Sequence, residues 1–438
     1  MRFLSTRDES DNPATVDICR ALRSGLAADG GLYVPETLPD PGPLDLAESS
    51  GLPETAAKVL EPFFADSGLA AVLPSICREA MDLPLPLDEF EPGGTWMLEL
   101  FHGPTAAFKD FAARFLASCL GHLRTTGDPV QTVLVATSGD TGGAVAAAFH
   151  RRPGFRVVIL YPDERVSARQ AHQLGAFGDN IHTFRVQGDF DDCQRLAKQA
   201  LEDRELNETM TLTSANSISI GRLLPQVTYY VHAISSMYRK LEKPVDVIVP
   251  TGNLGNALAC DLARRMGMPL GELVLATNAN RTLSEYFSGR DYQGRPGLAT
   301  LANAMDVGDP SNFERLAWFY RHQDLRSAGI SAVSIDDGTI GACIRRVHAD
   351  TGRVICPHTA CAVAALHRRR EAGNTDPCLV VATAHAAKFD NVVEPLLGKI
   401  VTPPPALAAL LGRKSRAGRV GTGFDEFREI LLDFPQGS

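Results

Sequence analysis

Residues 130–144 read Val-Gln-Thr-Val-Leu-Val-Ala-Thr-Ser-Gly-Asp-Thr-Gly-Gly-Ala, and this stretch predicts the fold. Val130–Val135 is a β-branched run typical of a strand, Ala136–Gly143 is a turn of small residues, and Ala144–Phe149 has a helical composition. A strand, a small-residue turn and a helix start predict an anion site, because backbone N–H groups at the start of a helix point at the ligand.

The same layout occurs a second time. Val245–Val249 is a strand candidate, Pro250–Asn256 is a turn, and a helix is expected from Ala257 to Arg265. Gly252 and Gly255 in this turn would let the backbone approach a phosphate closely. One such turn is common in α/β proteins, but two of them together favour a ligand site.

Strand and helix candidates alternate from Trp96 onward, which predicts parallel sheets covered by helices on both faces. The expected strands are 132–136, 156–161, 181–186, 245–249, 273–277 and 378–383, and the expected helices are 108–123, 143–150, 167–174, 190–201, 219–238 and 257–266. Residues 1–90 contain short helical stretches at 15–28, 52–64 and 68–81. We therefore expect an N-terminal, mainly helical domain at 1–90 and a catalytic region at 91–438. That region would have two α/β subdomains, the smaller at roughly 125–215. The segment after Val401 is the least informative.

Phe101–Phe111 reads Phe-His-Gly-Pro-Thr-Ala-Ala-Phe-Lys-Asp-Phe, and Lys109 is its only charged residue before Asp110. On these residues alone, Lys109 is either a surface lysine on the first turn of a helix or a lysine held in an apolar cleft. A desolvated lysine loses its charge readily and can act as a nucleophile that forms a Schiff base.

Composition limits the function. The 438 residues carry a formal net charge of −9, with 44% hydrophobic and 22% charged residues. The negative charge argues against a nucleic-acid partner, and no apolar stretch is long enough to predict a membrane span. Nine scattered cysteines without a Cys-x-x-Cys pair favour reduced thiols and a cytoplasmic location.

Two cofactor classes fit the sequence poorly. Cys356, His358 and Cys361 match no common zinc spacing, so no metal site is expected. There is also no Gly-x-Gly-x-x-Gly with an acidic residue about 20 positions on, which argues against a nicotinamide-dependent dehydrogenase.

The motifs, taken in order, resemble the threonine synthase family, which uses pyridoxal phosphate and shares the fold of the tryptophan synthase β chain. The resemblance runs nearly from end to end. It rests on Ser5–Arg7, Gly25–Pro35, His102–Asp110, Thr137–Gly142, Ala215–Ile218, Arg222–Gln226, Ala304–Val307, Pro357–Ala360, Thr383–His385 and Ala387–Phe389. The implied fold is that of a fold type II pyridoxal-phosphate enzyme, with parallel sheets flanked by helices.

The resemblance implies a cofactor site. Lys109 would hold pyridoxal phosphate covalently and then serve as the catalytic base. The cofactor phosphate would bind at Gly252, Asn253, Leu254, Gly255 and Asn256, where the family usually has Ser-Gly-Asn-Phe-Gly-Asp and this chain has Thr-Gly-Asn-Leu-Gly-Asn. Thr383 would face the pyridine nitrogen, while the adjacent His385 is equally compatible with a core role.

The resemblance also implies a substrate site. Thr137, Ser138, Asp140 and Thr141 would form the loop that holds the amino-acid carboxylate, with the Asp140 side chain turned away to orient the loop. A substrate phosphate would be bound by side chains with amide, hydroxyl, guanidinium or ammonium donors. The candidates are Asn216, Ser217, Arg222 and Lys388. For Arg222 and Lys388 an ordinary salt bridge on a helix face is an equal alternative. The family often has Asn where this chain has Ser219.

The expected function is a carbon–oxygen lyase that converts O-phospho-L-homoserine and water into L-threonine and phosphate, the last step of threonine biosynthesis. A related phospholyase that releases 2-oxobutyrate has a nearly identical motif set. A non-catalytic pyridoxal-phosphate-binding protein is a third interpretation, which the intact Lys109 disfavours. The sequence shows no sign of an obligate protein partner.

Overall fold

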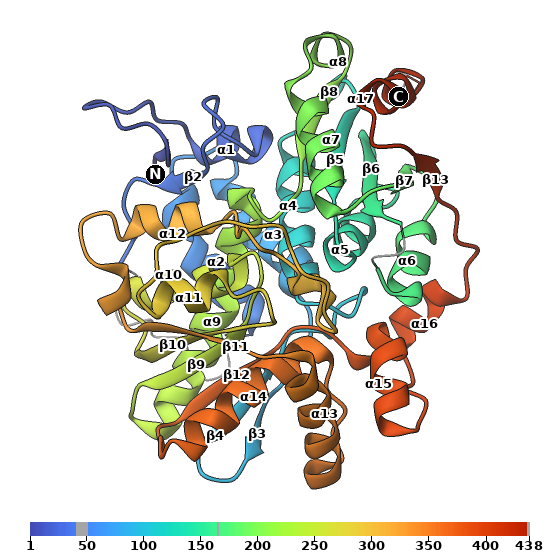
Figure 1. Ribbon diagram of the computed structural model, residues 1–438. Coiled ribbons are helices and arrows are strands. Elements are labelled where there is room, and N and C mark those ends of the chain that lie inside the picture. The colour runs from blue at the N-terminus through green and yellow to red at the C-terminus, as the bar shows by residue number, and fades with distance from the viewer. Residues whose placement is uncertain (41–50, 164–165, 436–438) are drawn as a thin grey trace.

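The computed structural model describes residues 1–40, 51–163 and 166–435. Within these residues the strands form three sheets of two, six and five strands. The two larger sheets lie in separate parts of the molecule, the five-stranded sheet near the C-terminus in the view of Figure 1 and the six-stranded sheet below the N-terminal segment. The predicted α/β class with helix-covered parallel sheets is confirmed.

The smaller sheet is parallel throughout, in the order β13-β7-β6-β5-β8. Its strands are β5 (Gln131–Ala136), β6 (Phe155–Pro162), β7 (Ile181–Val186), β8 (Thr211–Ser214) and β13 (Gly418–Val420). The neighbouring helices are α4 (Lys109–His122), α5 (Asp140–Phe149), α6 (Ala168–Gly175), α7 (Phe190–Glu202), α8 (Arg204–Thr209) and α17 (Phe424–Leu432). Strands β5 and β6 are buried along their whole length, as expected when helices cover both faces.

The larger sheet has the order β11-β10-β9-β12-β4-β3, and only its edge strand β3 is antiparallel to its neighbour. Its strands are β3 (Leu87–Glu91), β4 (Thr95–Glu99), β9 (Val245–Pro250), β10 (Leu270–Thr277), β11 (Ile330–Ser334) and β12 (Cys378–Ala382). Alternate residues of one strand enter different cores, since Val247 and Val249 pack in one apolar cluster and Ile248 in another. This follows from the two-residue period of a strand.

Helices cover both faces of this sheet. One face carries α9 (Ile220–Leu241) and α10 (Gly255–Arg265), and the other carries α13 (Asp337–Thr351) and α14 (Pro357–Glu371). The remaining helices are α11 (Thr282–Phe287), α12 (Phe313–Phe319), α15 (Asp390–Leu397) and α16 (Pro405–Leu411), with 3₁₀ turns at Ala70–Val72, Asn303–Met305, Leu325–Ser327 and Ala386–Phe389.

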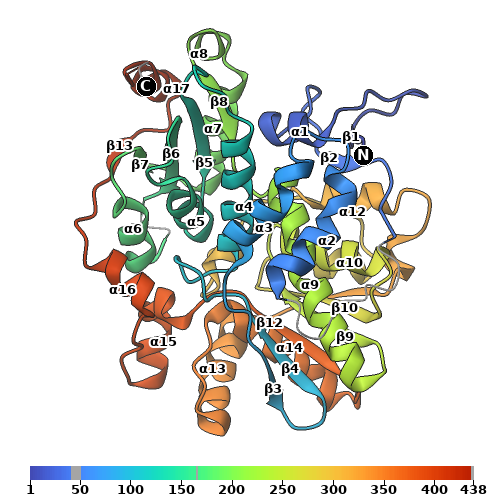
Figure 2. The same cartoon turned by 180° about the vertical axis from the view of Figure 1, so that it is seen from behind.

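The N-terminal segment combines a small antiparallel pair with three helices. The pair is β1 (Phe3–Ser5) with β2 (Tyr33–Pro35), and the helices are α1 (Ile18–Ser24), α2 (Leu52–Phe64) and α3 (Leu73–Met81). Helix α2 packs on α9, and α3 packs on α4, as Figure 2 shows from behind. The apolar core therefore runs from these helices into the rest of the protein. A domain boundary at residue 90 stays a prediction.

Several strands escaped the sequence-based expectation. Strands β3, β4, β8, β11 and β13 were not anticipated, because they are short or lack a β-branched run. The segment after Val401 was judged uninformative, yet β13 pairs with β7 and extends the smaller sheet. The strand expected over 378–383 ends at Ala382, so Thr383 lies just beyond it. Among the described residues, no helix combines the length and apolarity that a membrane span needs.

Candidate active site

Three strand ends and one helix start bring the predicted site residues together. The turn after β5 carries Thr137–Thr141, the turn after β9 carries Gly252–Asn256, and the segment after β12 carries Thr383–Lys388. Helix α4 begins at Lys109. Ligands of parallel α/β sheets bind at the carboxyl ends of the strands, and here the carboxyl ends of both larger sheets contribute.

The loop before α4 is built to present Lys109. The Thr105 hydroxyl donates to Asp110 Oδ1 at 2.6 Å, and the Thr105 N–H donates to Asp110 Oδ2 at 2.8 Å. A Cβ at Gly103 would come within 2.4 Å of the Asp110 carboxylate, so a glycine is required there. Ala106 takes a left-handed conformation with φ 56°, which costs a non-glycine residue energy and persists only when surrounding contacts hold it.

This loop is fixed to the segment that follows β12. The Phe108 N–H donates to the Thr383 carbonyl at 2.9 Å, and the His385 N–H donates to the Ala106 carbonyl at 3.0 Å. Lys109 and Thr383 are thereby held next to each other. The ring of His385 accepts the Ala387 N–H through Nδ1 at 3.1 Å and caps a 3₁₀ turn, which is a structural role.

Lys109 is half-buried, and its Nζ donates to the Thr141 hydroxyl at 2.8 Å. Burial lowers the pKa of Lys109 to about 8. The charge of Asp140 opposes this shift, whereas those of Arg222 and Lys388 add to it. A lysine with such a pKa is partly neutral near pH 7, as a nucleophile or proton acceptor requires.

Lys388 lies in the same site as Lys109, but its ammonium group has different partners. It is 1% exposed, and its Nζ lies 2.8 Å from Asp140 Oδ1 and 2.8 Å from the Thr105 carbonyl. Burial by itself would raise the pKa of Asp140, but the Lys388 and Lys109 ammoniums hold it well below its usual range. Gln170, the third residue of α6 and a partner of the N-cap Ser167 in its capping box, also donates to Asp140 at 2.9 Å. The salt-bridge alternative thus describes Lys388, although the pair is buried.

The Asp140 turn also uses its own side chains. The Thr137 hydroxyl accepts the N–H groups of Gly139 at 3.0 Å and Gly142 at 2.9 Å. Thr137 is buried and Ser138 is half-buried. Thr137 therefore shapes the loop, while Asp140 is turned toward Lys388 and Gln170. This arrangement accounts for a carboxylate in a loop that is expected to bind a carboxylate.

The turn after β9 has features of a phosphate cradle. Leu254 is left-handed with φ 61°, and α10 starts at the next residue with no acidic side chain in its first turn. The Asn256 side-chain oxygen accepts from Tyr229 at 2.6 Å and Tyr230 at 2.8 Å. Its buried Nδ2 has no partner among the described residues. Free donors at a helix N-terminus fit the phosphate of pyridoxal phosphate.

The two glycines of this turn differ. A Cβ at Gly252 would come within 2.7 Å of the Met305 backbone, so close packing requires this glycine. A Cβ at Gly255 would make only ordinary contacts, at 3.6 Å from Asn312 Nδ2 and 4.0 Å from Ser217 Cβ. The expected reason for both glycines was the approach of a phosphate, and the structure supplies a different reason for Gly252.

Arg222 is buried without a counter-ion. It is 2% exposed, its Nη1 donates to the Ala215 carbonyl at 2.6 Å, and its Nε has no partner among the described residues. Within the same residues no carboxylate forms an ion pair with it. Burial lowers the pKa of Arg222 to about 10. Nearby Asn216 Oδ1 and the Ser219 hydroxyl are also buried and find no partner in the described part of the chain. The salt-bridge alternative therefore does not describe Arg222.

His358 belongs to this environment; the sequence placed it in the Pro357–Ala360 motif and argued against a metal-binding role, but gave it no site role. It is 3% exposed, and its Nε2 accepts the Ala304 N–H at 3.0 Å. Burial lowers its pKa to about 4, so the ring is neutral at pH 7. Its Nδ1 has no partner among the described residues. Only a three-dimensional arrangement could show that His358 lies near Asp140 and Lys109.

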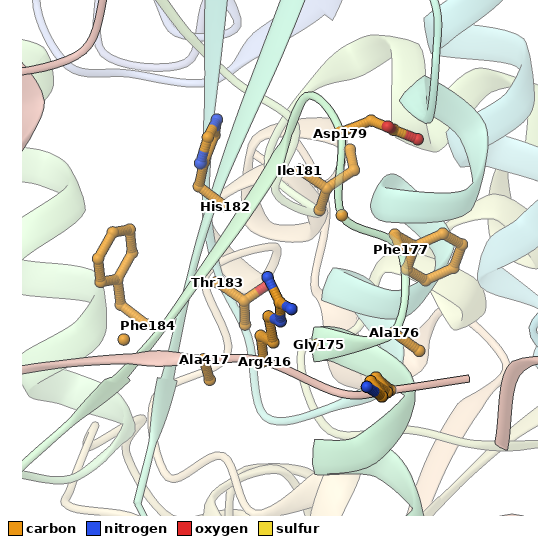
Figure 3. A pocket seen from close by; sticks show the side chains of 13 residues that line it. Gly175, Ala176, Phe177, Asp179, Ile181, His182, Thr183, Phe184, Arg416 and Ala417 are labelled. Atoms are coloured by element: carbon orange, nitrogen blue, oxygen red, sulfur yellow. The ribbon is translucent and has the colours of Figure 1, made fainter. Parts of the chain in front are cut away.

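No set of three or more ligating side chains suited to a metal occurs in the described part of the chain. A hollow of about 590 Å³ lies elsewhere, between the end of α6, strand β7 and the segment before β13 (Figure 3). None of the predicted site residues lines it.

Comparisons with known proteins cover the whole chain. The family model described as pyridoxal-phosphate dependent enzyme matches residues 86–384, and those described as threonine synthase N terminus and threonine synthase, C-terminal match residues 2–81 and 359–430. The chain is 36% identical to the threonine synthase of Serratia marcescens, over 99% of this chain and 100% of that one.

Solved structures agree in fold. The threonine synthase from Escherichia coli superimposes with a TM-score of 0.90 at 35% identity, covering 99% of this chain and 100% of that one. A threonine synthase from Brucella melitensis with bound pyridoxal phosphate gives a TM-score of 0.87 at 33% identity, with 98% of each chain covered.

Proposed function

The chain belongs to the threonine synthase family of pyridoxal-phosphate-dependent enzymes, and from this premise we propose that its substrate is O-phospho-L-homoserine. The reaction would use water and yield L-threonine and phosphate. The membership makes it a pyridoxal-phosphate-dependent lyase of threonine biosynthesis.

One observation supports the substrate assignment above the others. The candidate site has two separate places where buried donors lack partners among the described residues, at Asn256 and at Arg222. A phosphorylated substrate bound beside a phosphorylated cofactor needs two anion sites. The turn ending at Asn256 suits the cofactor phosphate, and Arg222 suits the substrate phosphate, because a guanidinium can donate two parallel hydrogen bonds to a phosphate.

When bound, pyridoxal phosphate supplies an electron sink for the bonds to the substrate α-carbon. Lys109, with its lowered pKa, would hold the cofactor, take one proton from Cα and one from Cβ, deliver one to Cγ after the phosphate has left, and return one to Cα after water has added at Cβ. Arg222 steadies the phosphate as it leaves from Cγ. The N–H groups of the Thr137–Thr141 turn hold the α-carboxylate, and Asp140 keeps Lys388 in place beside them.

Thr383 completes the proposed cofactor site. It is 5% exposed and is fixed through its carbonyl to the loop that carries Lys109. A hydroxyl facing the pyridine nitrogen leaves that nitrogen neutral, whereas a carboxylate there would favour its protonation. Cytoplasmic location and the absence of an obligate protein partner stay predictions.

The purified protein with pyridoxal phosphate should release threonine and inorganic phosphate in equal amounts from O-phosphohomoserine. Threonine and 2-oxobutyrate are measured in the same reaction. Phosphate release accompanied by 2-oxobutyrate would instead establish the phospholyase, and binding of the cofactor without phosphate release would establish the non-catalytic alternative.

A further inference from the structure

The N-terminal motifs have no place in the site described above. Ser5–Arg7 and Gly25–Pro35 contain no proposed ligand contact, yet they pack against α12 at two adjacent residues. Glu314 accepts from the Thr6 hydroxyl and from Arg7 Nη2, the latter at 2.9 Å. The next residue, Arg315, donates from Nε to the Tyr33 carbonyl at 3.0 Å. Figure 1 shows α12 beside this N-terminal segment.

Arg315 is among the most buried charged side chains of the described residues, with 0% exposure. Besides Tyr33, its guanidinium donates from Nη1 to Asn312 Oδ1 at 2.9 Å and from Nη2 to the Ile218 carbonyl at 2.5 Å. Within the described residues it forms no ion pair with a carboxylate. Three hydrogen bonds in three directions use the fork of an arginine, which a lysine lacks.

Asn312 continues this connection into both proposed phosphate sites. Its Nδ2 lies 2.9 Å from the carbonyl of Asn253 in the cofactor turn and 3.5 Å from the carbonyl of Ser217 in the substrate segment. Asn253 Nδ2 in turn donates to the Ser217 hydroxyl at 2.8 Å. Ser311 donates its N–H to Asn253 Oδ1 at 2.6 Å. The two segments are thus joined to each other and to Arg315.

We propose that Arg315 is a positioning residue that, through Asn312, holds the cofactor turn at Asn253 and the substrate segment at Ser217–Ile218 in one arrangement against strand β2. The proposal rests on the proposed function for the identity of the two ligands. It gives the N-terminal motifs a task, because they fix α12 and thereby fix both anion sites. Cofactor binding and substrate binding would then be coupled.

The charge of Arg315 supports the same assignment. Burying a cation without a counter-ion is costly, and burial lowers the pKa of Arg315 to about 9 while Glu314 acts in the opposite direction. Two phosphates bound at the neighbouring segments would offset this cost. Arg315 would therefore favour the bound dianions at the same time as it orients the groups that hold them.

The test compares Arg315→Met, Arg315→Lys and Asn312→Ala with Arg114→Met. Arg114 is a matched control because its guanidinium also donates to backbone carbonyls, at Ala80 at 3.1 Å and at Glu79, but it joins α3 to α4. For each variant the dissociation constant of pyridoxal phosphate is measured by equilibrium dialysis of the apoprotein. Its Tm without cofactor and its KM for O-phosphohomoserine are also measured.

We expect Arg315→Met to weaken cofactor binding and to raise KM, each roughly 10-fold, as expected for lost hydrogen bonds to a charged group. Arg315→Lys should recover only part of this loss. Asn312→Ala should shift both values in the same direction, and the double variant should be less than additive. Arg114→Met should lower Tm only.

If Arg315→Met and Asn312→Ala lower Tm but leave the cofactor dissociation constant and KM within twofold of the parent, Arg315 is merely structural and the proposal is overturned. If Arg315→Met does not fold, Asn312→Ala decides by the same criterion. The dissociation constant of pyridoxal phosphate is measured without any turnover. Release of 2-oxobutyrate by the parent enzyme would therefore contradict the proposed function but would leave the conclusion on Arg315 unchanged.

Discussion

Two turns with the same strand–turn–helix layout contribute to the candidate site, and they differ in charge. The turn after β5 carries Asp140 in the first turn of α5, where it is neutralised by Lys388 at 2.8 Å. The turn after β9 has no acidic residue in the first turn of α10, and Asn256 there leaves a buried donor free of partners among the described residues. The two turns therefore suit different anions, a carboxylate at the first and a phosphate at the second.

A small-residue turn at a helix start therefore does not by itself identify its ligand. Around the first turn, Lys388 already balances the charge of Asp140, and the Thr137 hydroxyl takes the N–H groups of Gly139 and Gly142. The turn offers its other N–H groups to a carboxylate, which carries a smaller charge than a phosphate. Around the second turn and around Arg222, buried donors lack hydrogen-bond partners among the described residues, which favours phosphates.

Breaking the charge balance of the first turn should have the largest effect. Asp140→Asn leaves the Lys388 ammonium buried without its counter-ion, which we expect to cost about 3–5 kcal/mol in the free energy of unfolding of the apoprotein. Urea denaturation measures it. Adding Lys388→Met should restore most of the stability, because the unpaired charge is then gone. If the double variant is as unstable as Asp140→Asn alone, the ion pair of Asp140 and Lys388 is not what balances the charge at this turn.

Removing the buried guanidinium of Arg222 should weaken the stabilisation of the substrate phosphate. Arg222→Ala should lower kcat/KM for O-phosphohomoserine by an amount that corresponds to a loss of about 2–5 kcal/mol of transition-state stabilisation. Arg222→Lys should keep the charge but lose the two parallel hydrogen bonds that a guanidinium can donate. Binding of threonine, which has no phosphate, should change little, as isothermal titration can measure. Equal losses for both ligands, together with a lower Tm, would make Arg222 a structural residue.

The two glycines of the second turn sharpen its assignment. Gly252→Ala should destabilise the apoprotein by about 1–3 kcal/mol, because its Cβ would meet the Met305 backbone at 2.7 Å. Gly255→Ala has room for its Cβ and should stabilise the apoprotein slightly. It should still weaken pyridoxal-phosphate binding, measured by dialysis. Unchanged binding in Gly255→Ala would move the phosphate away from this turn.

The smallest expected effect is a shift in pH dependence. With a pKa of about 8, Lys109 is protonated below this pH and neutral above it. The rate at which apoprotein links pyridoxal phosphate should therefore rise with pH and level off above about 8. In Asp140→Asn combined with Lys388→Met, the midpoint should move to lower pH, because the raising effect of Asp140 exceeds the lowering effect of Lys388. A shift of the midpoint to higher pH would show that Lys388 affects the pKa of Lys109 more strongly than Asp140 does.

The sequence predicted those strands and helices in which the spacing of apolar residues matches the period of the element. The long buried strands β5, β6, β7 and β9 lie within two residues of their expected bounds, as do most of the helices that follow them. Strands β4 and β13 were missed because their short segments gain their conformation from neighbouring strands rather than from composition. Local propensity carries no record of such pairing.

The candidate site shows the same division. Lys109, Thr141 and Arg222 were named from motifs, and the structure places Lys109 against Thr141. The partners of Asp140 and the environment of His358 could not be foreseen, because Lys388 and Gln170 reach Asp140 from distant parts of the chain. Arg315 escaped notice altogether, since the carbonyls it contacts leave no pattern in the sequence.

Lys109, and not Lys388, which lies against Asp140 in the same site, is proposed to hold the cofactor. The most direct measurement is borohydride reduction of the protein with bound pyridoxal phosphate, followed by peptide mapping by mass spectrometry. The label should lie on Lys109, and Lys109→Ala should bind the cofactor without covalent label and without turnover. A label on Lys388, or a Lys109→Ala variant that still reacts and is still labelled, would contradict the account.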